Sequence, residues 1–300
     1  MTPTDQAITD WRNWLLAAGR SATTVEAYVW DMTSLAKRFP GKAPIEYKST
    51  DLQLYQAERR LAGISASARK RSAASFRSFF GYVCGKSKSP AKTLPFPRVE
   101  RTAQRVLDWE QAGRVLAACE TTTAVGLRDL AIVCLAMESA LRCAELCRLE
   151  VAKVDLEHRR LRVVIKGGKE GVGSFDPLTG SYLAAWLAAR AKIALPETKT
   201  VFCSVGGLTP GRALTPGGLR CIFRQIGRKA GLAAFSPHDL RRSCATLKTR
   251  LGAPSRTVQV GGRWSNLREV ETYTQSISLD DFEAYSPVAH IMRPAAPPSP

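Results

Sequence analysis

The chain has 300 residues, of which 45% are hydrophobic and 23% charged, and its formal net charge is +18 at pH 7. A chain of this length allows two domains, each large enough for its own core. The excess of basic residues indicates a polyanionic partner, and nucleic acid is the simplest one. No segment reaches the roughly 18 consecutive apolar residues of a membrane span, and the first residues lack the basic and apolar stretches of a signal peptide. We therefore expect no membrane partner and a cytoplasmic, nucleoid-associated location.

Helices are predicted throughout the first 88 residues. Ser21 can cap a second helix, a third begins near Ser49, and a fourth covers about 65–83. The first helix carries an apolar stripe at helical spacing, made of Ile8, Trp11, Leu15 and Leu16. We assign residues 1–88 to a helical DNA-binding domain.

The fourth predicted helix is strongly basic. Between positions 59 and 105 the only acidic residue is Glu100. A basic cluster is most often just a solvated helix face, but this imbalance favours a surface that follows DNA phosphates. We predict that the DNA-binding residues of this domain are Arg69, Lys70, Arg71 and Arg77.

Residues 89–104 are rich in proline and basic residues, which predicts an extended linker between two domains. A helix start near Asp108 then opens a second domain, assigned to residues 105–287. This domain is predicted to be mostly helical with one small sheet. Residues 288–300 form a Pro-rich tail.

Two polar groups occur early in the second domain. Arg142 and Glu145 are one helical turn apart, so they can pair or face a site together, although an ordinary surface ion pair is the simpler reading. Between 161 and 178, β-branched residues flank a Gly-rich turn, which predicts two strands. Lys166 at the end of the first strand can reach a phosphate or a leaving oxygen. Alternatively, Lys166 and Lys169 merely solvate the tip of the hairpin.

The C-terminal part holds residues suited to phosphodiester chemistry. His238 has an arginine, Arg241, at i+3 on the same face of a predicted helix, whereas His158 lies in a predicted turn and His290 in the Pro-rich tail. Trp264 and Tyr273 follow, nine residues apart. A phenol has a pKa of about 10, so it needs positive charge and a proton acceptor to act as a nucleophile. Taken singly, Trp264 could fill a core pocket and Tyr273 could be a packing residue.

The eight cysteines lie between Cys84 and Cys244 without a C-x-x-C pair. Cys143 and Cys147 are four residues apart, where two small buried side chains are a simpler interpretation than metal ligands. We therefore predict no metal site, and a reducing cytoplasm is the simplest setting.

The order of these motifs resembles that of tyrosine recombinases of the phage integrase and Xer type. The matching segments are 140–146 around Arg142, 165–170 around Lys166, 237–243 around His238 and Arg241, and 271–274 around Tyr273. The resemblance implies a mainly α fold with a small β-sheet: an N-terminal four-helix core-binding (SAM-like) domain and a C-terminal α+β catalytic domain.

The resemblance also implies a role for each site residue. Arg142 and Arg241 would clamp the scissile phosphate, and Tyr273 would form a 3′-phosphotyrosyl link. Lys166 would protonate the leaving 5′-oxygen and His238 would assist proton transfer at the nucleophile, while Glu145 would orient its neighbours. This chemistry requires no cofactor, because the covalent link conserves the bond energy.

Two positions depart from the family pattern. Arg263-Trp264 stands where many members have Gly-His, and Gly171 stands where the lysine hairpin often carries arginine. An indole N–H can donate one hydrogen bond but cannot transfer a proton. Trp264 is therefore expected to bind the phosphate rather than act as an acid or base.

The expected function is site-specific DNA recombination on double-stranded target sites. The resemblance implies a homotetramer on two sites, in which a helix over 279–285 docks into a neighbouring subunit, although that helix could also pack on its own domain. DNA-bending or directionality proteins are possible accessory partners. The alternatives are type IB topoisomerase-like cleavage and rejoining of one strand, and a catalytically inactive DNA-binding accessory protein.

Overall fold

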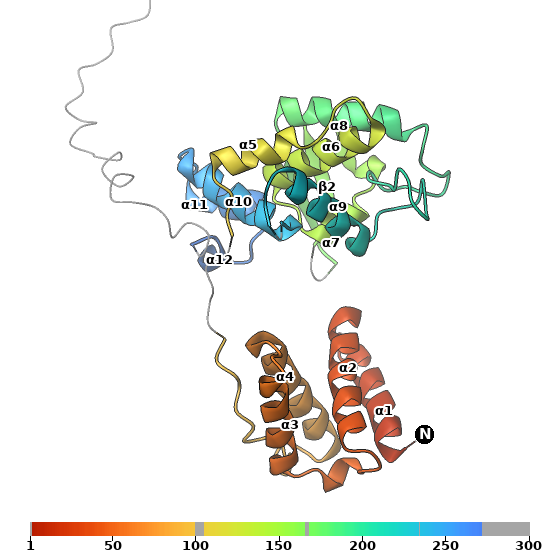
Figure 1. Cartoon of the computed structure of the whole chain (residues 1–300), viewed down its shortest axis with the longest axis vertical. Coiled ribbons are helices and arrows are strands. Elements are labelled where there is room, and N and C mark those ends of the chain that lie inside the picture. The colour runs from red at the N-terminus through yellow and green to blue at the C-terminus, as the bar shows by residue number, and fades with distance from the viewer. Residues whose placement is uncertain (1, 100–104, 166–167, 234, 272–300) are drawn as a thin grey trace, which may run out of the picture. The chain divides into compact units, whose positions relative to one another are not determined.

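The computed structural model describes residues 2–99, 105–165, 168–233 and 235–271. The chain divides into two compact units, Met1–Thr102 and Ala103–Pro300 (Figure 1). Within the described residues, helices dominate both units, and the second also has a small sheet. The predicted fold class, mainly α with a small sheet, is confirmed.

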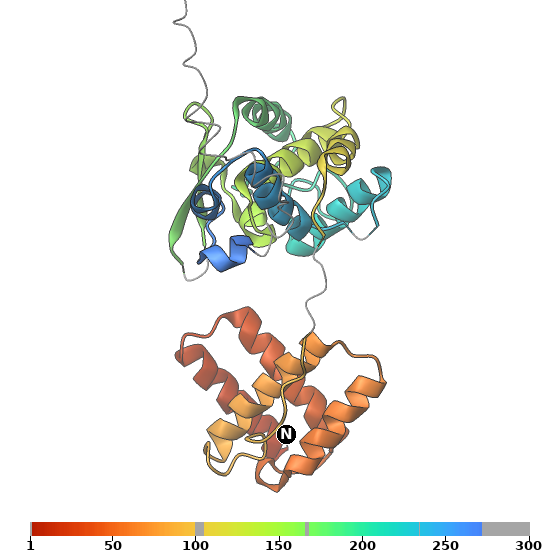
Figure 2. The ribbon, with the colours of Figure 1, turned by 90° about the vertical axis from the view of Figure 1, so that its left-hand side faces the viewer.

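The described part of the first unit contains helices at the predicted places (Figures 1 and 2). Ser21 and Ser65 begin the second and fourth by accepting backbone N–H groups three residues later. Leu16 is 40% exposed, so the predicted apolar stripe of the first helix stops at Leu15. The helices are α1 (Pro3–Ala17), α2 (Ala22–Arg38), α3 (Ser49–Leu61) and α4 (Ala66–Val83), with a short 3-10 turn at Pro44–Glu46.

Aromatic side chains fill the core of the first unit. Trp11, Phe76, Phe79 and Phe80 are fully buried. The rings of Trp11 and Phe79 meet edge to face, with centroids 5.3 Å apart, an arrangement that aromatic pairs prefer. The apolar face of α4 therefore closes on α1 and α2.

The predicted linker starts too early at residue 89. Ala91 and Leu94 are fully buried in the aromatic core of the first unit. Arg77 donates from Nη2 to the Leu94 carbonyl at 2.5 Å and from Nε to the Ala91 carbonyl at 3.3 Å, and its guanidinium lies 3.9 Å from the Phe96 ring centroid. Composition indicated an open tether, but two apolar side chains and one arginine hold this segment against α4.

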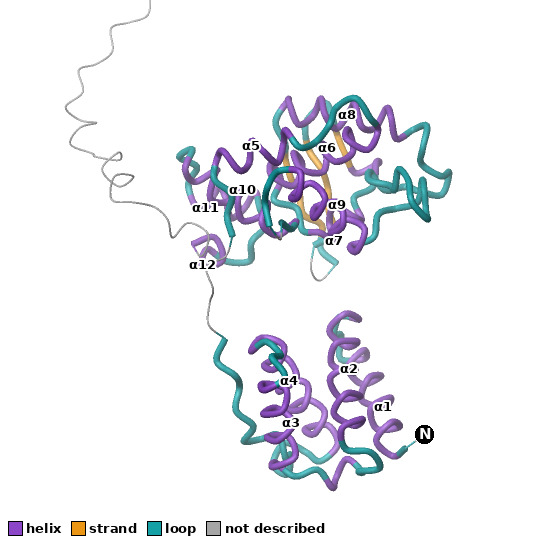
Figure 3. Tube along the Cα trace, viewed as in Figure 1, coloured by secondary structure: helices purple, strands orange, loops and turns teal. Residues whose placement is uncertain are grey.

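The second unit is mostly helical, and its small sheet lies at one edge (Figures 2 and 3). Its described elements are α5 (Trp109–Ala117), α6 (Ala124–Ser139), α7 (Cys143–Arg148), a 3-10 turn (Val151–Lys153), β1 (Val154–Asp155), β2 (Arg160–Val164), β3 (Glu170–Ser174), α8 (Pro177–Arg190), α9 (Pro216–Lys229), α10 (Pro237–Arg250), α11 (Ser255–Gly261) and α12 (Leu267–Glu271).

The described strands form an antiparallel sheet in the order β1-β2-β3. Val163 of β2 lies opposite Gly171 of β3, and the Ile165 N–H donates to the Lys169 carbonyl at 2.8 Å, which closes the hairpin. The two predicted strands are confirmed, and the two-residue strand β1 adds to them.

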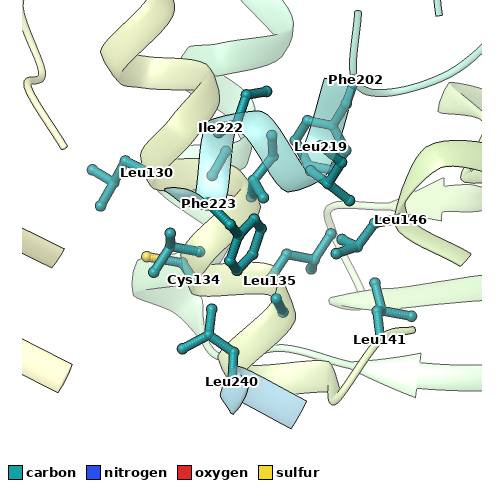
Figure 4. Close-up of a cluster of buried hydrophobic side chains, with 14 of the residues drawn as sticks. Leu130, Cys134, Leu135, Leu141, Leu146, Phe202, Leu219, Ile222, Phe223 and Leu240 are labelled. Carbon is teal, nitrogen blue, oxygen red and sulfur yellow. The ribbon is translucent and has the colours of Figure 1, made fainter. Parts of the chain in front are cut away.

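Helix α6 is the centre of the second core. Residues 130–136 are all buried, and the helix packs against α8 and α10. Leu141, Leu146 and Leu240 join the same apolar cluster (Figure 4). Leu141 and Leu240 each precede a predicted phosphate-binding arginine, so core packing fixes the backbone from which each arginine extends.

No helix in the described ranges is long and apolar enough to cross a bilayer.

Replacing Leu94 by alanine tests whether residues 89–96 belong to the first unit. We expect Leu94→Ala to lower the stability of that unit by about 2–5 kcal/mol, because a fully buried leucine leaves a cavity. The measurement is urea unfolding of the full chain, followed by hydrogen exchange and mass spectrometry of peptides from α4. Leu61→Ala is the control, because Leu61 is 89% exposed. Equal stability of Leu94→Ala and the parent chain would contradict this assignment.

Candidate active site

The site is built on the C-terminal end of α6. A helix leaves its last carbonyls without intrahelical partners, and Ala140 after α6 has a left-handed φ of 48°. Arg241 of α10 donates from Nη1 to the Ala140 carbonyl, and Arg263 donates from Nη2 to the Ser139 carbonyl at 2.8 Å. Cations are favourable at this end of a helix. Two distant arginines therefore hold the turn that leads into Arg142.

Arg142 is the N-cap residue of α7 and not part of the helix itself. Its backbone N–H donates to Glu145 Oε2 at 2.9 Å, and its Nη1 donates to Oε1 at 2.8 Å. The Glu145 side chain is only 4% exposed, whereas that of Arg142 is 39% exposed. The expected pairing of the two residues is thus present, and part of the guanidinium still faces solvent.

Glu145 is held as a carboxylate. Burial acts to raise its pKa, but hydrogen bonds from Arg142 and the positive charges of Arg263 and Arg142 outweigh burial, and the pKa lies below its ordinary value. Glu145 therefore carries its charge at neutral pH and can orient both arginines.

Helix α10 carries His238 and Arg241 near its start. Pro237 occupies the first turn, and Ser236 donates its backbone N–H to Asp239 Oδ2 at 2.9 Å, which fixes the entry into the helix. Arg241 is buried, with its guanidinium carbon 4.4 Å from the Trp264 ring centroid. Such stacking is favourable for a cation and an indole.

The His238 side chain is exposed to solvent and lies among positive charges. Partial desolvation by neighbouring groups lowers its pKa most, and Arg242, Arg241 and Arg142 lower it further, while Asp239 opposes them. Histidine has an ordinary pKa of about 6.5, so His238 is neutral at pH 7. A neutral imidazole has a free lone pair and can accept a proton.

Trp264 is 5% exposed and belongs to a small apolar cluster. Its ring lies directly over Gly262, where an added Cβ would come within 1.6 Å of the ring. The simpler reading, that Trp264 fills a core pocket, describes its packing well. Its contact with Arg241 nevertheless places it beside the predicted phosphate-binding group.

Arg263 is the residue that sequence reasoning missed. The sequence marked it only as a departure from the family pattern, yet its side chain is 5% exposed and lies 3.5 Å from Glu145 Oε2. A Cβ on Gly171 would lie 2.7 Å from Arg263 Cδ. The two departures, at positions 171 and 263, are therefore in contact. The sequence signal that could have indicated this contact is the spacing of Gly171 and Gly173, because alternate glycines leave one face of a strand without side chains.

The structure brings together five predicted residues: Arg142, Glu145, His238, Arg241 and Trp264. Lys166 and Tyr273 lie outside the described residues, as do the predicted helix over 279–285 and the tail over 288–300.

The predicted DNA-binding residues of α4 have mixed environments. Lys70 is exposed, and Arg69 donates from Nε to the Ile64 carbonyl at 3.1 Å. Arg71 binds the fully buried Asp31 through two hydrogen bonds of 2.9 and 3.1 Å and remains 43% exposed. Arg77 instead binds backbone carbonyls of its own unit, as described above.

In the described part of the chain, no group of three or more His, Cys, Asp and Glu residues could hold a metal ion. The eight cysteines are free thiols.

Comparison with known proteins agrees with this geometry. The sequence pattern of the Phage integrase family matches residues 105–278. Tyrosine recombinase XerC of Corynebacterium efficiens is 31% identical over 285 residues, which cover 93% of this chain and 90% of that protein. Tyrosine recombinase XerD of Listeria innocua is 28% identical over 278 residues, covering 89% of this chain and 93% of that protein.

Solved structures share the fold at low sequence identity. The XerH site-specific recombinase bound to a palindromic difH substrate has a TM-score of 0.72 at 19% identity and covers 91% of this chain and 82% of its own. The lambda integrase tetramer bound to a Holliday junction has a TM-score of 0.69 at 14% identity and covers 91% of this chain and 78% of its own. The chain therefore belongs to the phage integrase family and is a tyrosine-type site-specific DNA recombinase.

Proposed function

We propose that Tyr273 is the nucleophile of this recombinase and that Arg142 and Arg241 bind the scissile phosphate. The observation that carries the proposal is that both arginines are anchored to the same turn after α6, beside His238, whose lowered pKa keeps it neutral at pH 7. Guanidinium groups held in place before the reaction stabilise the negative charge that develops on the phosphoryl oxygens.

Each proton in the proposed reaction has a donor and an acceptor. The Tyr273 phenol oxygen attacks phosphorus while its proton passes to His238, and the 5′-oxygen leaves with a proton from Lys166. The products are a 3′-phosphotyrosyl link and a 5′-hydroxyl. A 5′-hydroxyl of the partner duplex then attacks the link and releases the phenol, so the exchange requires no external energy source.

Trp264 supports Arg241 in this proposal. Its ring covers the Arg241 guanidinium, and its N–H is the one group it can offer to a phosphate oxygen. The close approach of the ring to Gly262 leaves it little freedom to move.

We propose that the first unit binds the same duplex through the exposed end of α4. Lys70 is exposed, and Arg71 keeps part of its guanidinium in solvent while Asp31 fixes its direction. The exposed Trp30 ring lies 5.8 Å from the Arg71 guanidinium and adds a flat apolar surface. Such contacts supply affinity from phosphates and position the protein. Arg77 serves the fold of the unit more directly than DNA.

We propose that a homotetramer on two target sites performs the exchange. The tetrameric assembly of lambda integrase on a Holliday junction supports this proposal. Nucleoid association and accessory DNA-bending or directionality proteins follow as further expectations, because the substrate is chromosomal or mobile DNA.

Trapping the covalent intermediate tests the nucleophile. Suicide substrates nicked near candidate sites from the DNA that flanks the gene should give an SDS-resistant protein–DNA adduct with the parent chain. Tyr273→Phe should give none, because the variant lacks the attacking oxygen. Tyr182→Phe is the matched control and should react normally, since Tyr182 lies on α8 in a pocket that none of the proposed site residues lines. Binding of a site without any adduct would instead indicate an inactive DNA-binding protein.

The pH dependence of adduct formation tests His238. Because its pKa is lowered, the neutral base persists below the ordinary histidine value, and activity falls only when the pH drops through that lowered pKa. We expect the acid midpoint of the single-turnover rate at saturating DNA to lie below about 6.5. His238→Gln should remove this titration and lower the plateau about 10²–10⁴-fold. A midpoint at or above the ordinary value, or an unchanged profile in the variant, contradicts the assignment.

Counting the sites that a reaction needs tests the strand exchange. We expect joint products only from DNA that carries two target sites, because the attacking 5′-hydroxyl comes from a second duplex. The measurement compares one-site and two-site substrates on denaturing gels, with Tyr273→Phe as the blank. Relaxation of a supercoiled plasmid with one site, without joint products from two, would favour a topoisomerase.

A further inference from the structure

Arg263 combines two features that cost free energy. Its φ is 56°, in the left-handed region that non-glycine residues seldom adopt. Its guanidinium is also buried, which lowers its pKa even though Glu145 lies nearby. A strained backbone and a buried cation persist only where the surrounding contacts hold them in place.

The contacts of Arg263 reach separate parts of the site. Nη2 donates to the Ser139 carbonyl at 2.8 Å and lies 3.5 Å from Glu145 Oε2. Nη1 donates to the Gly261 carbonyl at 3.0 Å and to the Val172 carbonyl of β3 at 3.5 Å. One side chain therefore connects the turn before Arg142, the carboxylate that holds Arg142, and the hairpin.

Strand β3 leaves room for the Arg263 side chain, because two of its residues are glycines. Gly171 and Gly173 lie on one face of β3, and added Cβ atoms would lie 2.7 Å from Arg263 Cδ and 3.1 Å from Nη1. A Cβ at position 171 would force Arg263 or Ile165 to shift, and one at position 173 would press on Leu161 and, less closely, on Arg263. The space for the side chain thus depends on two alternate glycines.

Arg263 is also joined to the second phosphate-binding arginine. The next residue in the chain is Trp264, whose ring covers the guanidinium of Arg241. Arg263 thus acts on Arg142 through Glu145, and on Arg241 through the backbone that carries Trp264.

We propose that Arg263 is a positioning residue that holds Arg142 and Arg241 in register for the scissile phosphate without itself touching DNA. This inference rests on the proposed function of the site. Arg263 should therefore affect the rate of the chemical step but not the affinity of the protein for DNA.

Single-turnover kinetics on suicide DNA test the proposal. At saturating DNA, Arg263→Gln should lower the rate constant of adduct formation about 10- to 100-fold, because small displacements of positioning groups slow chemistry by such factors. The final fraction of protein that forms the adduct and the Kd for DNA should stay unchanged. Misfolding alone would instead lower that fraction. The rate constant of Arg263→Lys should lie between those of Arg263→Gln and the parent chain, since lysine keeps the charge but lacks the planar guanidinium. Arg224→Gln, which changes an exposed charge on α9, is the control.

A double-mutant cycle tests the route through Glu145. We expect the Arg263→Gln substitution to lower the rate constant of adduct formation by a smaller factor in the Glu145→Gln background than in the parent chain. The reason is that part of its effect acts through the Glu145 carboxylate. Equal factors in both backgrounds overturn that route.

Hydrogen exchange in the free protein separates this inference from the proposed function. The Arg142 amide is bonded to Glu145, so Arg263→Gln should speed its exchange and that of β3 while leaving α8 unchanged. If the parent chain forms no adduct, the proposed function fails, and exchange alone decides the inference. If the parent chain reacts and Arg263→Gln reacts equally fast, or if exchange at Arg142 is unchanged, the inference is overturned.

Discussion

The end of α6 is the constraint on which the site depends. A buried helix must find donors for its last carbonyls, and here the donors are arginines from segments far along the chain: Arg241 for Ala140 and Arg263 for Ser139. The hydrogen bonds that end the helix therefore also assemble the site. Because Leu141 and Leu240 are buried in one core beside Arg142 and Arg241, apolar packing and polar contacts specify the same arrangement.

The charge balance of the site is uneven without DNA. Arg142, Arg241, Arg242 and Arg263 lie near His238 or Glu145, and after desolvation the charges of Arg242, Arg241 and Arg142 are what lowers the pKa of His238. Glu145 offsets part of this repulsion, but the carboxylate is bonded on the protein side and leaves outward-facing positive charge. A phosphate diester brings the missing negative charge, so binding energy arises where bond cleavage needs it.

Local patterns in the sequence were sufficient for the helices, for the hairpin and for the pairing of Arg142 with Glu145, because caps, periodicity and i,i+3 spacing act between near neighbours. They were insufficient for contacts between distant segments. Arg77 was interpreted as a DNA contact but binds the carbonyl of Leu94, and Arg263 meets Ser139 across 124 positions. A basic residue has the same appearance in a sequence whether it faces a phosphate, a carboxylate or a carbonyl. The burial that distinguishes these cases is a property of the folded chain.

The packing of Arg263 against the glycines of β3 limits which substitutions this sequence can accept. The arginine at position 263 fits closely because position 171 lacks a Cβ, which would lie 2.7 Å from its Cδ, and position 173 adds a looser constraint at 3.1 Å from Nη1. The side chains allowed at positions 171 and 263 are therefore coupled: a residue larger than glycine at 171 costs least when position 263 carries a smaller side chain.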